Sequence, residues 1–524
     1  MAGADKDLVL GYDFGTSALK AALLDRSGRI VANMSAPYPL LLPARGCAEQ
    51  RPKDWWNAMA GLTPRLLSAA SAEPARVAAL AVSAQMCGVV PVDEHGEALS
   101  NCLIWLDTRS SAIARRLVKG WIKISGYGVA NLVRWLRLTG GAPNLSGKDP
   151  PSKMLWLREN EPAVWRRTHK LLDVADYIVH HLTGRFVTSF DRAHLTWLFD
   201  ARAGHKHWSP ALLSRVGLDR TLLPEVLGAS DIGGGLRGQS AQALGLHPET
   251  PVAVGLGDVA AAALASGTKG LSAPHLNIGT SSWLGANVAR KRVDPLTGIG
   301  SICGADGGDY LLIATQENAG ACIAWALEAL GFAAGEYTHF EAEAQTAEPR
   351  LDAPLFFPWL GGERVPVDDK HLRGGFLNLS LADKRGSLAR AVYEGVALNM
   401  RWAMDDFDRL GACAGKPLRV VGGGAASALW CQIFADVLGR ELETVELTGL
   451  SGARGAAMTA AVAAKWFPDL SAASATVKAV RSFAPNPDHA ALYQERYRRF
   501  VAGHSRLGPW YNRFADGGQN AKHA

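Results

Sequence analysis

The chain has 524 residues, of which 48% are hydrophobic and 20% are charged, so it is long enough for two domains that each bury a core. Its net charge of +6 is modest and its Lys and Arg residues are scattered, which suits a small polyanionic ligand better than nucleic acid. The seven cysteines are odd in number and form no CxxC pair, which favours reduced thiols in a cytoplasmic protein over disulfides or a zinc site.

The N-terminal segment follows the pattern strand, turn, strand. Residues 8–14 are apolar and alternating, residues 15–17 (Gly-Thr-Ser) predict a turn, and residues 19–25 return to a strand pattern. A helical pattern follows at residues 55–67. The apolar run at residues 75–84 predicts a buried strand that ends in the sequence Ser-Ala-Gln-Met-Cys-Gly. Polar residues at the end of such a strand are typical of ligand sites in open α/β sheets.

A polar, Gly-containing stretch separates the two halves of the chain. We place the domain boundary at its end, which gives domains of residues 1–249 and 250–524. The run Gly233–Gly235 within this stretch is predicted to be a loop. The apolar residues 251–267 are broken by glycines and contain an aspartate, so we expect no membrane span there. The N-terminus lacks the basic and apolar regions of a signal peptide, which agrees with a cytoplasmic location.

The second half begins with a similar pattern. Residues 276–289 predict a strand, a Gly-Thr-Ser turn and a second strand, so that NIGTS at residues 277–281 matches DFGTS at residues 13–17. This match suggests an internal duplication in which each half presents one phosphate-facing hairpin. Residues 418–424 predict a strand that enters a glycine turn. The apolar stripe at residues 429–438 then predicts a helix that stops at a glycine.

The first Gly-Thr-Ser turn has the chemistry of a phosphate site. Gly15 would let backbone N–H groups approach an anion, and the Thr16 and Ser17 hydroxyls can donate to phosphate oxygens. Lys20 can add a positive charge, and Asp13 can hold a hydrated Mg²⁺ ion. A turn of this sequence alone is more often an ordinary hairpin than a phosphate site.

Two further segments carry candidate chemistry. Asp258 leaves a strand and begins an alanine-rich run, so it is either a helix N-cap or a carboxylate that can take a proton from an alcohol. Three glycines at residues 422–424 would allow a flat or anionic ligand to approach a helix N-terminus. Phosphoryl transfer requires phosphate donors, a metal and a base that positions the acceptor hydroxyl. The combination therefore favours phosphoryl transfer in a cleft between two domains.

A colinear series of segments resembles the FGGY carbohydrate kinases, and among them the xylulokinases. In family order, the segments are DFGTSALK, SAQMCG, LIWLDTRS, PSKMLWLRENEP, DYIVHHLTGRFVTSFD, GLGDVAAAALASG, LNIGTSS, FFPWLGGERVP, GGFLNLSLADKRGSLARAVYEGVALN and VVGGGAASALWCQIFADVLG. They cover residues 8–465. The resemblance implies an actin/hexokinase-like (ribonuclease H-like) fold with an interdomain cleft, in which the first domain mainly binds sugar and the second mainly binds nucleotide.

The resemblance also implies roles for individual residues in a direct, in-line transfer from MgATP to a ketopentose such as xylulose. Asp258 becomes the general base on the sugar hydroxyl, and Asp13 becomes the carboxylate on the Mg²⁺ side. The expected phosphate and nucleotide residues are Gly15, Thr16, Ser17, Lys20, Gly279, Thr280, Gly423 and Gly424. The residues expected near the sugar are Gln85, Met86, Trp105 and Asp107, for which a framework role is an equal alternative.

Departures from the xylulokinase pattern concentrate on the sugar side. Cys87 stands where those kinases usually have His, Val259 stands where they have Asn, and Arg192 and His194 replace small polar residues. A thiol is a poor hydrogen-bond donor, so the contacts to the sugar must differ. The acceptor therefore stays open among xylulose, ribulose, a pentitol, a tetritol and glycerol.

Two other classes of protein are alternatives, namely a non-catalytic sugar sensor and an actin-like ATP-binding protein. The presence of both Asp13 and Asp258 argues against a silent sensor, and the Gln-Met-Cys-Gly segment argues against an actin-like ATPase. The sequence does not determine the oligomeric state, although a homodimer is compatible with the resemblance. His205 and His207 flank a lysine, and without a third ligand they do not predict a metal site.

Overall fold

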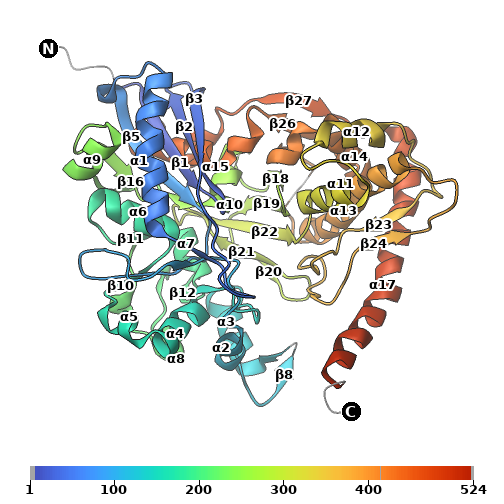
Figure 1. Cartoon of the computed structure of the whole chain (residues 1–524), viewed down its shortest axis with the longest axis horizontal. Coiled ribbons are helices and arrows are strands. Elements are labelled where there is room, and N and C mark those ends of the chain that lie inside the picture. Colours follow the sequence, from blue (N-terminus) through green and yellow to red (C-terminus); the bar gives the residue numbers. More distant parts are fainter. Residues whose placement is uncertain (1–5, 125, 269, 413–414, 521–524) are drawn as a thin grey trace.

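The computed structural model describes residues 6–124, 126–268, 270–412 and 415–520. Two large sheets form its centre, one from the N-terminal half and one mainly from the C-terminal half, and helices surround them (Figure 1). This architecture confirms the predicted α/β fold class. None of the helices in the described part of the chain is long and apolar enough to cross a lipid bilayer.

The first sheet is organised around a buried central strand, β5, in which every residue is buried, as expected for a strand covered on both faces. β1 and β16 run parallel to β5, and β2 and β3 continue antiparallel beyond β1. The strands in order are β15 (Ile232–Gly235), β16 (Pro251–Ala253), β5 (Val77–Ala84), β1 (Leu8–Phe14), β2 (Ala18–Asp25) and β3 (Ile30–Pro37), and β17 (Leu256–Gly257) also pairs with β5. The strands predicted in this half are confirmed.

The second sheet repeats the order and direction of the first. β18 and β19 form a hairpin, β22 lies antiparallel beyond β19, and β25 and β26 follow β18 in parallel. The strands in order are β20 (Val293–Asp294), β21 (Ile299–Cys303), β22 (Tyr310–Gln316), β19 (Ser282–Val288), β18 (Pro274–Ile278), β25 (Leu418–Val421), β26 (Leu442–Val445) and β27 (Ala479–Phe483). The Gly-Thr-Ser turn joins the matching hairpin strands in each sheet, which supports the suggested duplication.

The two faces of the first sheet are covered by helices from different parts of the chain. Alternate side chains of β1 point to opposite faces, as the strand period requires. One face packs against α1 (Pro52–Ala69) and α6 (Val174–Thr183), and the other packs against α15 (Ser451–Ala463) and α10 (Asp258–Ala265). A Cβ atom on Gly11 would lie 2.2 Å from the carbonyl oxygen of Ala453, so only glycine lets α15 approach β1 this closely. The C-terminal half thus supplies a helix that covers the N-terminal sheet.

The second sheet is covered mainly by a cluster of helices at the other side of the molecule (Figure 1). The helix predicted at residues 429–438 is α14 (Ala428–Leu438), and it ends at Gly439 in the left-handed conformation with φ of 63°. The other helices of this group are α11 (Gly320–Ala329), α12 (Tyr337–Gln345), α13 (Arg385–Arg409) and α17 (Ala490–Asn520).

The structure corrects one prediction and refines another. The run Gly233–Gly235, predicted as a loop, lies in strand β15, where its backbone pairs with β16 and the Thr183 side chain occupies the space beside Gly234. Backbone pairing requires no side chains, so a glycine-rich composition, which is typical of loops, is compatible with a strand here.

The expected domain boundary after residue 249 precedes β16 and β17. Both strands pair with the first sheet, so the change from one sheet to the other falls between Gly257 and Pro274. The division into two domains itself remains a prediction.

Candidate functional site

Two carboxylates lie on either side of the end of β5. Asp13 is in β1, opposite Ser83 of β5, and Asp258 directly follows the short strand β17, which pairs with the other edge of β5 at Ala84. The carboxyl ends of these parallel strands meet at one edge of the sheet, so residues far apart in the chain come together there. Val259 N donates to Asp258 Oδ1 at 2.9 Å, and the other oxygen of Asp258 has no hydrogen-bond partner among the described residues.

The negative charge of Asp13 affects the ionisation of Asp258. Burial raises the pKa of Asp258 to about 7, and the negative charge of Asp13 adds to this rise. Burial also raises the pKa of Asp13 to about 6, although the ammonium group of Lys20 opposes that rise. Both groups are only partly exposed at the surface. A carboxylate whose pKa lies near neutrality can accept a proton effectively at physiological pH.

A buried network of side-chain amides holds the first Gly-Thr-Ser turn. Gln85 Nε2 donates to Gly15 O at 3.1 Å and to Gln50 Oε1 at 2.6 Å, while Gln50 Nε2 donates to Thr16 O at 2.6 Å. The indole Nε1 of Trp105 donates to Thr16 Oγ1 at 3.0 Å. Gln85 and Trp105 therefore lie beside the turn and support it, and their expected contact with a sugar stays a prediction.

The other two residues expected near the sugar lie close to the same loops. The sulfur of Met86 packs against Gly257, where a Cβ atom would lie 2.3 Å from it. Asp107 is fully buried, and its Oδ2 accepts Ala48 N and Arg109 Nε, both at 2.8 Å. Asp107 thus stabilises the loop that carries Trp105, and its predicted contact with a sugar stays a prediction.

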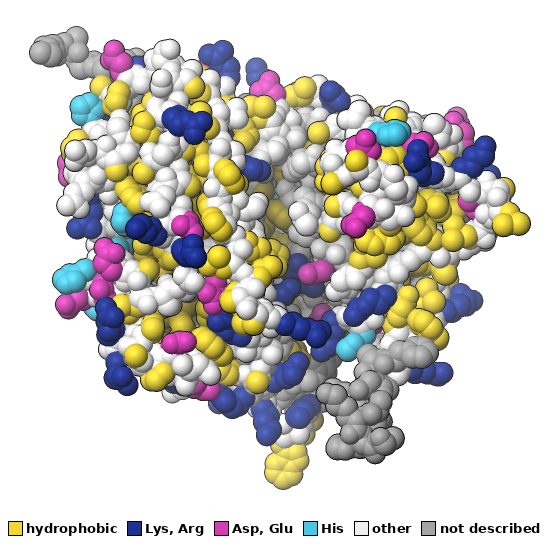
Figure 2. Space-filling model, in the orientation of Figure 1, with side chains coloured by type: hydrophobic (Ala, Val, Ile, Leu, Met, Phe, Trp, Pro, Cys, Tyr) yellow, Lys and Arg dark blue, Asp and Glu magenta, His cyan; other side chains and the backbone are white. Residues whose placement is uncertain are grey.

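Lys20, which follows the first turn, contacts the other half of the chain. Lys20 pairs with Asp13 across the β1–β2 hairpin, and its Nζ donates to Gly449 O at 2.8 Å, just before α15. Ser17 is exposed at the tip of the turn. On the face of the molecule in Figure 2, a recess separates the two lobes and Lys and Arg side chains gather along its lower part. Positive charge at such a recess favours a polyanionic ligand.

The second Gly-Thr-Ser turn is fixed by the start of α11. Ala319 N donates to Thr280 O and Gly320 N donates to Gly279 O, both at 2.9 Å. A Cβ atom on Gly320 would lie 2.7 Å from Gly279 O, so the absence of a side chain permits this contact. Thr280 itself is exposed at the tip of the turn and is free to meet a ligand.

The glycine turn after β25 lies directly on the residue that precedes this second turn. Gly422 has φ of +91°, and a Cβ atom there would be 2.5 Å from Ile278 O. Gly424 packs against the Ile278 side chain, where a Cβ atom would lie within 2.4 Å. Gly423 has no atom within 4 Å of its Cβ position, so it faces open space. Gly423, Gly424, Gly279 and Thr280 therefore lie together, as the sequence led us to expect.

The departures on the sugar side have clear structural settings. Arg192 is buried and forms an ion pair with Asp176 at 3.1 Å. Burial lowers the pKa of His194 to about 4, and the Nδ1 atom of His194 accepts a backbone N–H of β21. Both ring nitrogens of His194 are held by backbone groups, whereas Nη1 of Arg192 is buried without a hydrogen-bond partner among the described residues. Asp191, which the sequence analysis missed, accepts the Gly257 N–H at 2.8 Å and so holds the loop that carries the second carboxylate. Its partner lies 66 residues further along the chain, so no local pattern marked it.

A buried lysine joins the two loops around Cys87 and Trp105. Lys153 is fully buried, and its Nζ donates to Cys87 O at 2.9 Å and to Ile104 O at 2.7 Å. Cys87 has φ of 64°, a left-handed conformation that non-glycine residues rarely adopt. The lysine therefore holds the Cys87 backbone in an unusual conformation next to Met86.

A loop of the N-terminal half connects the surroundings of the two turns. Lys148 lies just before α4 (Pro150–Asn160), with its Nζ 5.8 Å from the centre of the Trp105 ring and 3.7 Å from Glu317 Oε1. Trp105 is bonded to Thr16 of the first turn, and Glu317 directly follows β22, near the second turn. Lys148 thus forms a bridge between the two sides of the site.

Comparisons with known proteins match both halves of the chain to one family. Residues 8–265 match the N-terminal domain, and residues 275–464 the C-terminal domain, of the FGGY family of carbohydrate kinases. The xylulose kinase of Lactococcus lactis is 30% identical over 493 residues, which cover 94% of this chain and 95% of that protein. The crystal structures of a xylulose kinase and of a gluconate kinase from Lactobacillus acidophilus each align with a TM-score of 0.85 and 26% identity, and each alignment covers 97% of this chain and 99% of the other.

Proposed function

The chain belongs to the FGGY family of carbohydrate kinases, which phosphorylate sugars with ATP, and we propose that its acceptor is xylulose or a closely similar ketopentose. The observation that best supports phosphoryl transfer to a hydroxyl is the position of Asp13 and Asp258 on either side of the end of β5, beside the first Gly-Thr-Ser turn. Near-complete alignment with a xylulose kinase supports the choice of sugar.

Asp258 is proposed to take the proton of the acceptor hydroxyl as the γ-phosphoryl group arrives in line. Three features support this role: it directly follows a strand end, it has one oxygen without a partner among the described residues, and its pKa is raised to about 7. Asp191 positions it by holding the backbone N–H of Gly257. No covalent phospho-enzyme is required, because a single displacement transfers the group directly.

The two turns are proposed to hold the phosphate groups of ATP. Thr16 and Thr280 offer hydroxyls, while Gly15 and Gly279 leave room for a phosphate to approach the backbone. Gly423 faces open space beside the second turn, which suits the approach of the nucleotide. Donors that are fixed before the reaction stabilise the charge that develops in the transition state.

Asp13 suits the Mg²⁺ ion that the reaction is expected to use. Its carboxylate is partly buried with a raised pKa, so a nearby cation would offset the cost of ionising it. When bound, the ion would neutralise negative charge on the phosphates of ATP. Ser17 and Lys20 lie on the same hairpin and would act on the same phosphates.

The sugar itself is best identified by a panel of acceptors. Cys87, in place of the histidine of the xylulokinase pattern, and the similarity to a gluconate kinase make ribulose, gluconate, pentitols, tetritols and glycerol the acceptors to compare with xylulose. We expect the highest kcat/KM for ADP release with xylulose. A higher kcat/KM for another acceptor would replace xylulose in the proposal, and no stimulation by any of them would favour a sugar-sensing or actin-like ATP-binding protein. We also propose a cytoplasmic location, because ATP is present there.

The pH dependence of turnover should report the ionisation of Asp258. Asp258 can act as a base only when it is ionised, so kcat/KM for the sugar should rise with pH and level off above an apparent pKa of about 7. In Asp13→Asn the neighbouring negative charge is lost, so the same midpoint should move to lower pH. Profiles with identical midpoints in the two proteins would contradict the coupling.

The bridge formed by Lys148 is expected to limit wasteful hydrolysis of ATP. Lys148→Gln should increase ADP release in the absence of sugar and raise the KM for sugar more than it lowers kcat, because a cleft that closes incompletely admits water. Lys148→Arg should retain the pair with Glu317 and behave like the unmodified enzyme. Arg185→Gln is a matched control, since it breaks a surface ion pair with Glu225 within one half of the chain. Equal ADP release without sugar in all three variants would refute this role.

A further inference from the structure

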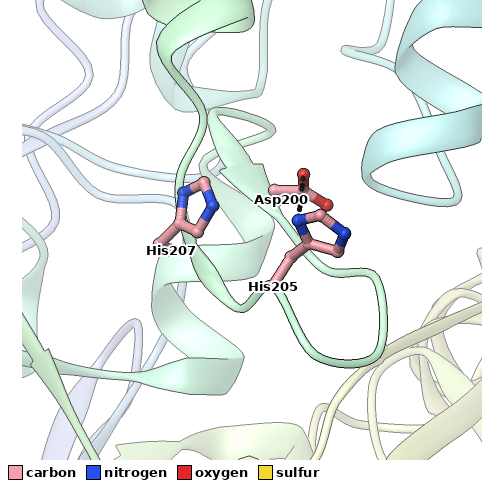
Figure 3. A group of neighbouring side chains, drawn as sticks. All are labelled: Asp200, His205 and His207. Atoms are coloured by element: carbon pink, nitrogen blue, oxygen red, sulfur yellow. Dashed lines mark ion pairs between the residues drawn. The ribbon is translucent and has the colours of Figure 1, made fainter.

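The fold supplies a third potential ligand to the pair of histidines that the sequence analysis set aside. Strands β12 (Phe199–Asp200) and β13 (His207–Trp208) form a short hairpin in which Asp200 lies directly opposite His207. One side-chain donor atom from each of Asp200, His205 and His207 lies within 4.8 Å of the other two. Figure 3 shows the two imidazole rings and the carboxylate turned towards a common space. None of these residues belongs to the site described above.

The hydrogen bonds of this hairpin leave side-chain atoms available to bind a metal ion. His207 Nδ1 lies 2.9 Å from Trp208 O, and donation of its N–H to that carbonyl leaves the Nε2 lone pair available. Metal-binding histidines commonly donate their other ring N–H to a carbonyl in this way. His205 Nδ1 faces Asp200 Oδ2 at a distance of 3.8 Å. A tetrahedral ion with ligand bonds of about 2.0–2.2 Å would need only small side-chain movements to contact all three.

Arg202 orients the carboxylate without using all of its binding capacity. Its Nε donates to Asp200 Oδ1 at 2.9 Å and its Nη2 donates to Oδ2 at 2.7 Å. An ionised carboxylate has about four lone-pair positions, so an additional ligand bond is possible. Hydrogen-bonded carboxylates are usual in metal sites, although the positive charge of Arg202 will reduce the affinity for a cation.

The hairpin is also held in place by the C-terminal half, which reduces the entropic cost of ordering the ligands. Tyr310 OH donates to Ala201 O at 2.8 Å, and Lys206 Nζ donates to Gly307 O. Asp200 is buried, while His205 and His207 are exposed and accessible from solvent. An ion could therefore enter from solvent and meet a partly fixed set of donors.

We propose that Asp200, His205 and His207 form a binding site for Zn²⁺ or a similar divalent transition-metal ion, with water as the fourth ligand. Two imidazole nitrogens and one carboxylate oxygen match the preferences of Zn²⁺, whereas Mg²⁺ prefers oxygen ligands throughout. The Mg²⁺ ion of the kinase reaction is therefore not expected to compete for this site. Because the hairpin contacts both halves of the chain, binding should also stabilise the folded protein.

The test is Zn²⁺ binding by the untagged, full-length protein after treatment with a chelator. Calorimetric titration should find one Zn²⁺ ion per chain, and His205→Ala and His207→Ala should each weaken binding at least about 10-fold. His247→Ala is the matched control, because that histidine is exposed but lies outside the hairpin. Zn²⁺ should raise the melting temperature of the unmodified protein and of the control, but not that of the double variant His205→Ala/His207→Ala.

A parallel titration with Co²⁺ distinguishes this site from binding by cysteines. Ligation by the hairpin should give a spectrum without thiolate charge-transfer absorption, and that spectrum should be lost in the double variant. Equal Zn²⁺ affinity in the double variant and the unmodified protein, or a thiolate absorption band from the bound Co²⁺, would overturn the proposal.

Discussion

Asp258→Asn is expected to lower kcat by about 10²- to 10⁴-fold, because an amide cannot take the proton of the acceptor hydroxyl. The substitution keeps the size of the side chain at the start of α10, where a neutral oxygen can still accept the Val259 N–H. The KM values for sugar and ATP should change much less than kcat. The measurement is steady-state ADP release at saturating sugar and MgATP, compared with Asp219→Asn, which alters an exposed aspartate that caps a surface turn.

The stability of the same variant distinguishes loss of the base from loss of the fold. The raised folded-state pKa of Asp258 means that ionising this group costs stability as the pH rises from its unfolded value through about 7. Asparagine carries no charge, so Asp258→Asn should melt at a higher temperature than the unmodified protein at pH 8. An inactive variant that melts at a lower temperature would indicate that Asp258 supports the fold instead.

Asp13→Asn is expected to lower kcat by about 100-fold or more and to increase the concentration of Mg²⁺ that is needed for half-maximal activity. The carboxylate at the end of β1 is the group proposed to face the ion, and the charge stabilisation that a metal gives to phosphoryl transfer is worth several kcal/mol. Rates measured across a range of free Mg²⁺ concentrations at fixed ATP provide the test.

The comparison of Asp13→Asn with Asp258→Asn separates the roles of the two carboxylates. Asp258→Asn should leave the Mg²⁺ dependence unchanged, because this side chain is proposed to face the sugar hydroxyl. If both variants shifted the Mg²⁺ requirement equally, the division of labour between a metal-side carboxylate and a base would be wrong.

Much of the fold could be predicted because its signals are local. The alternation in β1 and β2, the apolar run of β5 and the glycine at the end of α14 are each complete within a short window of sequence. The position of the carboxylates at strand ends was likewise visible in the pattern. The strand at Gly233–Gly235 was missed because its conformation is determined by backbone pairing with β16, which cannot be inferred from the local composition.

The features of the site that could not be predicted from the sequence depend on contacts between segments that are distant in the chain. Gln85 supports the turn at Gly15 instead of facing open space, and Asp191 holds a backbone N–H 66 residues away. Lys148 bridges the two sides of the site only because it pairs with Glu317, which lies in the other half of the chain. In the same way, Asp200 joins the two histidines only because strand pairing in the hairpin puts it opposite His207.

Sugar phosphorylation with Asp258 as the base is tested most directly by measuring the products of one reaction, with purified protein, MgATP and xylulose, by mass spectrometry and phosphorus NMR. We expect one sugar monophosphate for each ADP formed, and no sugar phosphate when Asp258→Asn replaces the unmodified protein over the same time. ADP without any phosphorylated product, from xylulose or from any other acceptor of the panel, would contradict the assignment of a sugar kinase that uses Asp258 as its base.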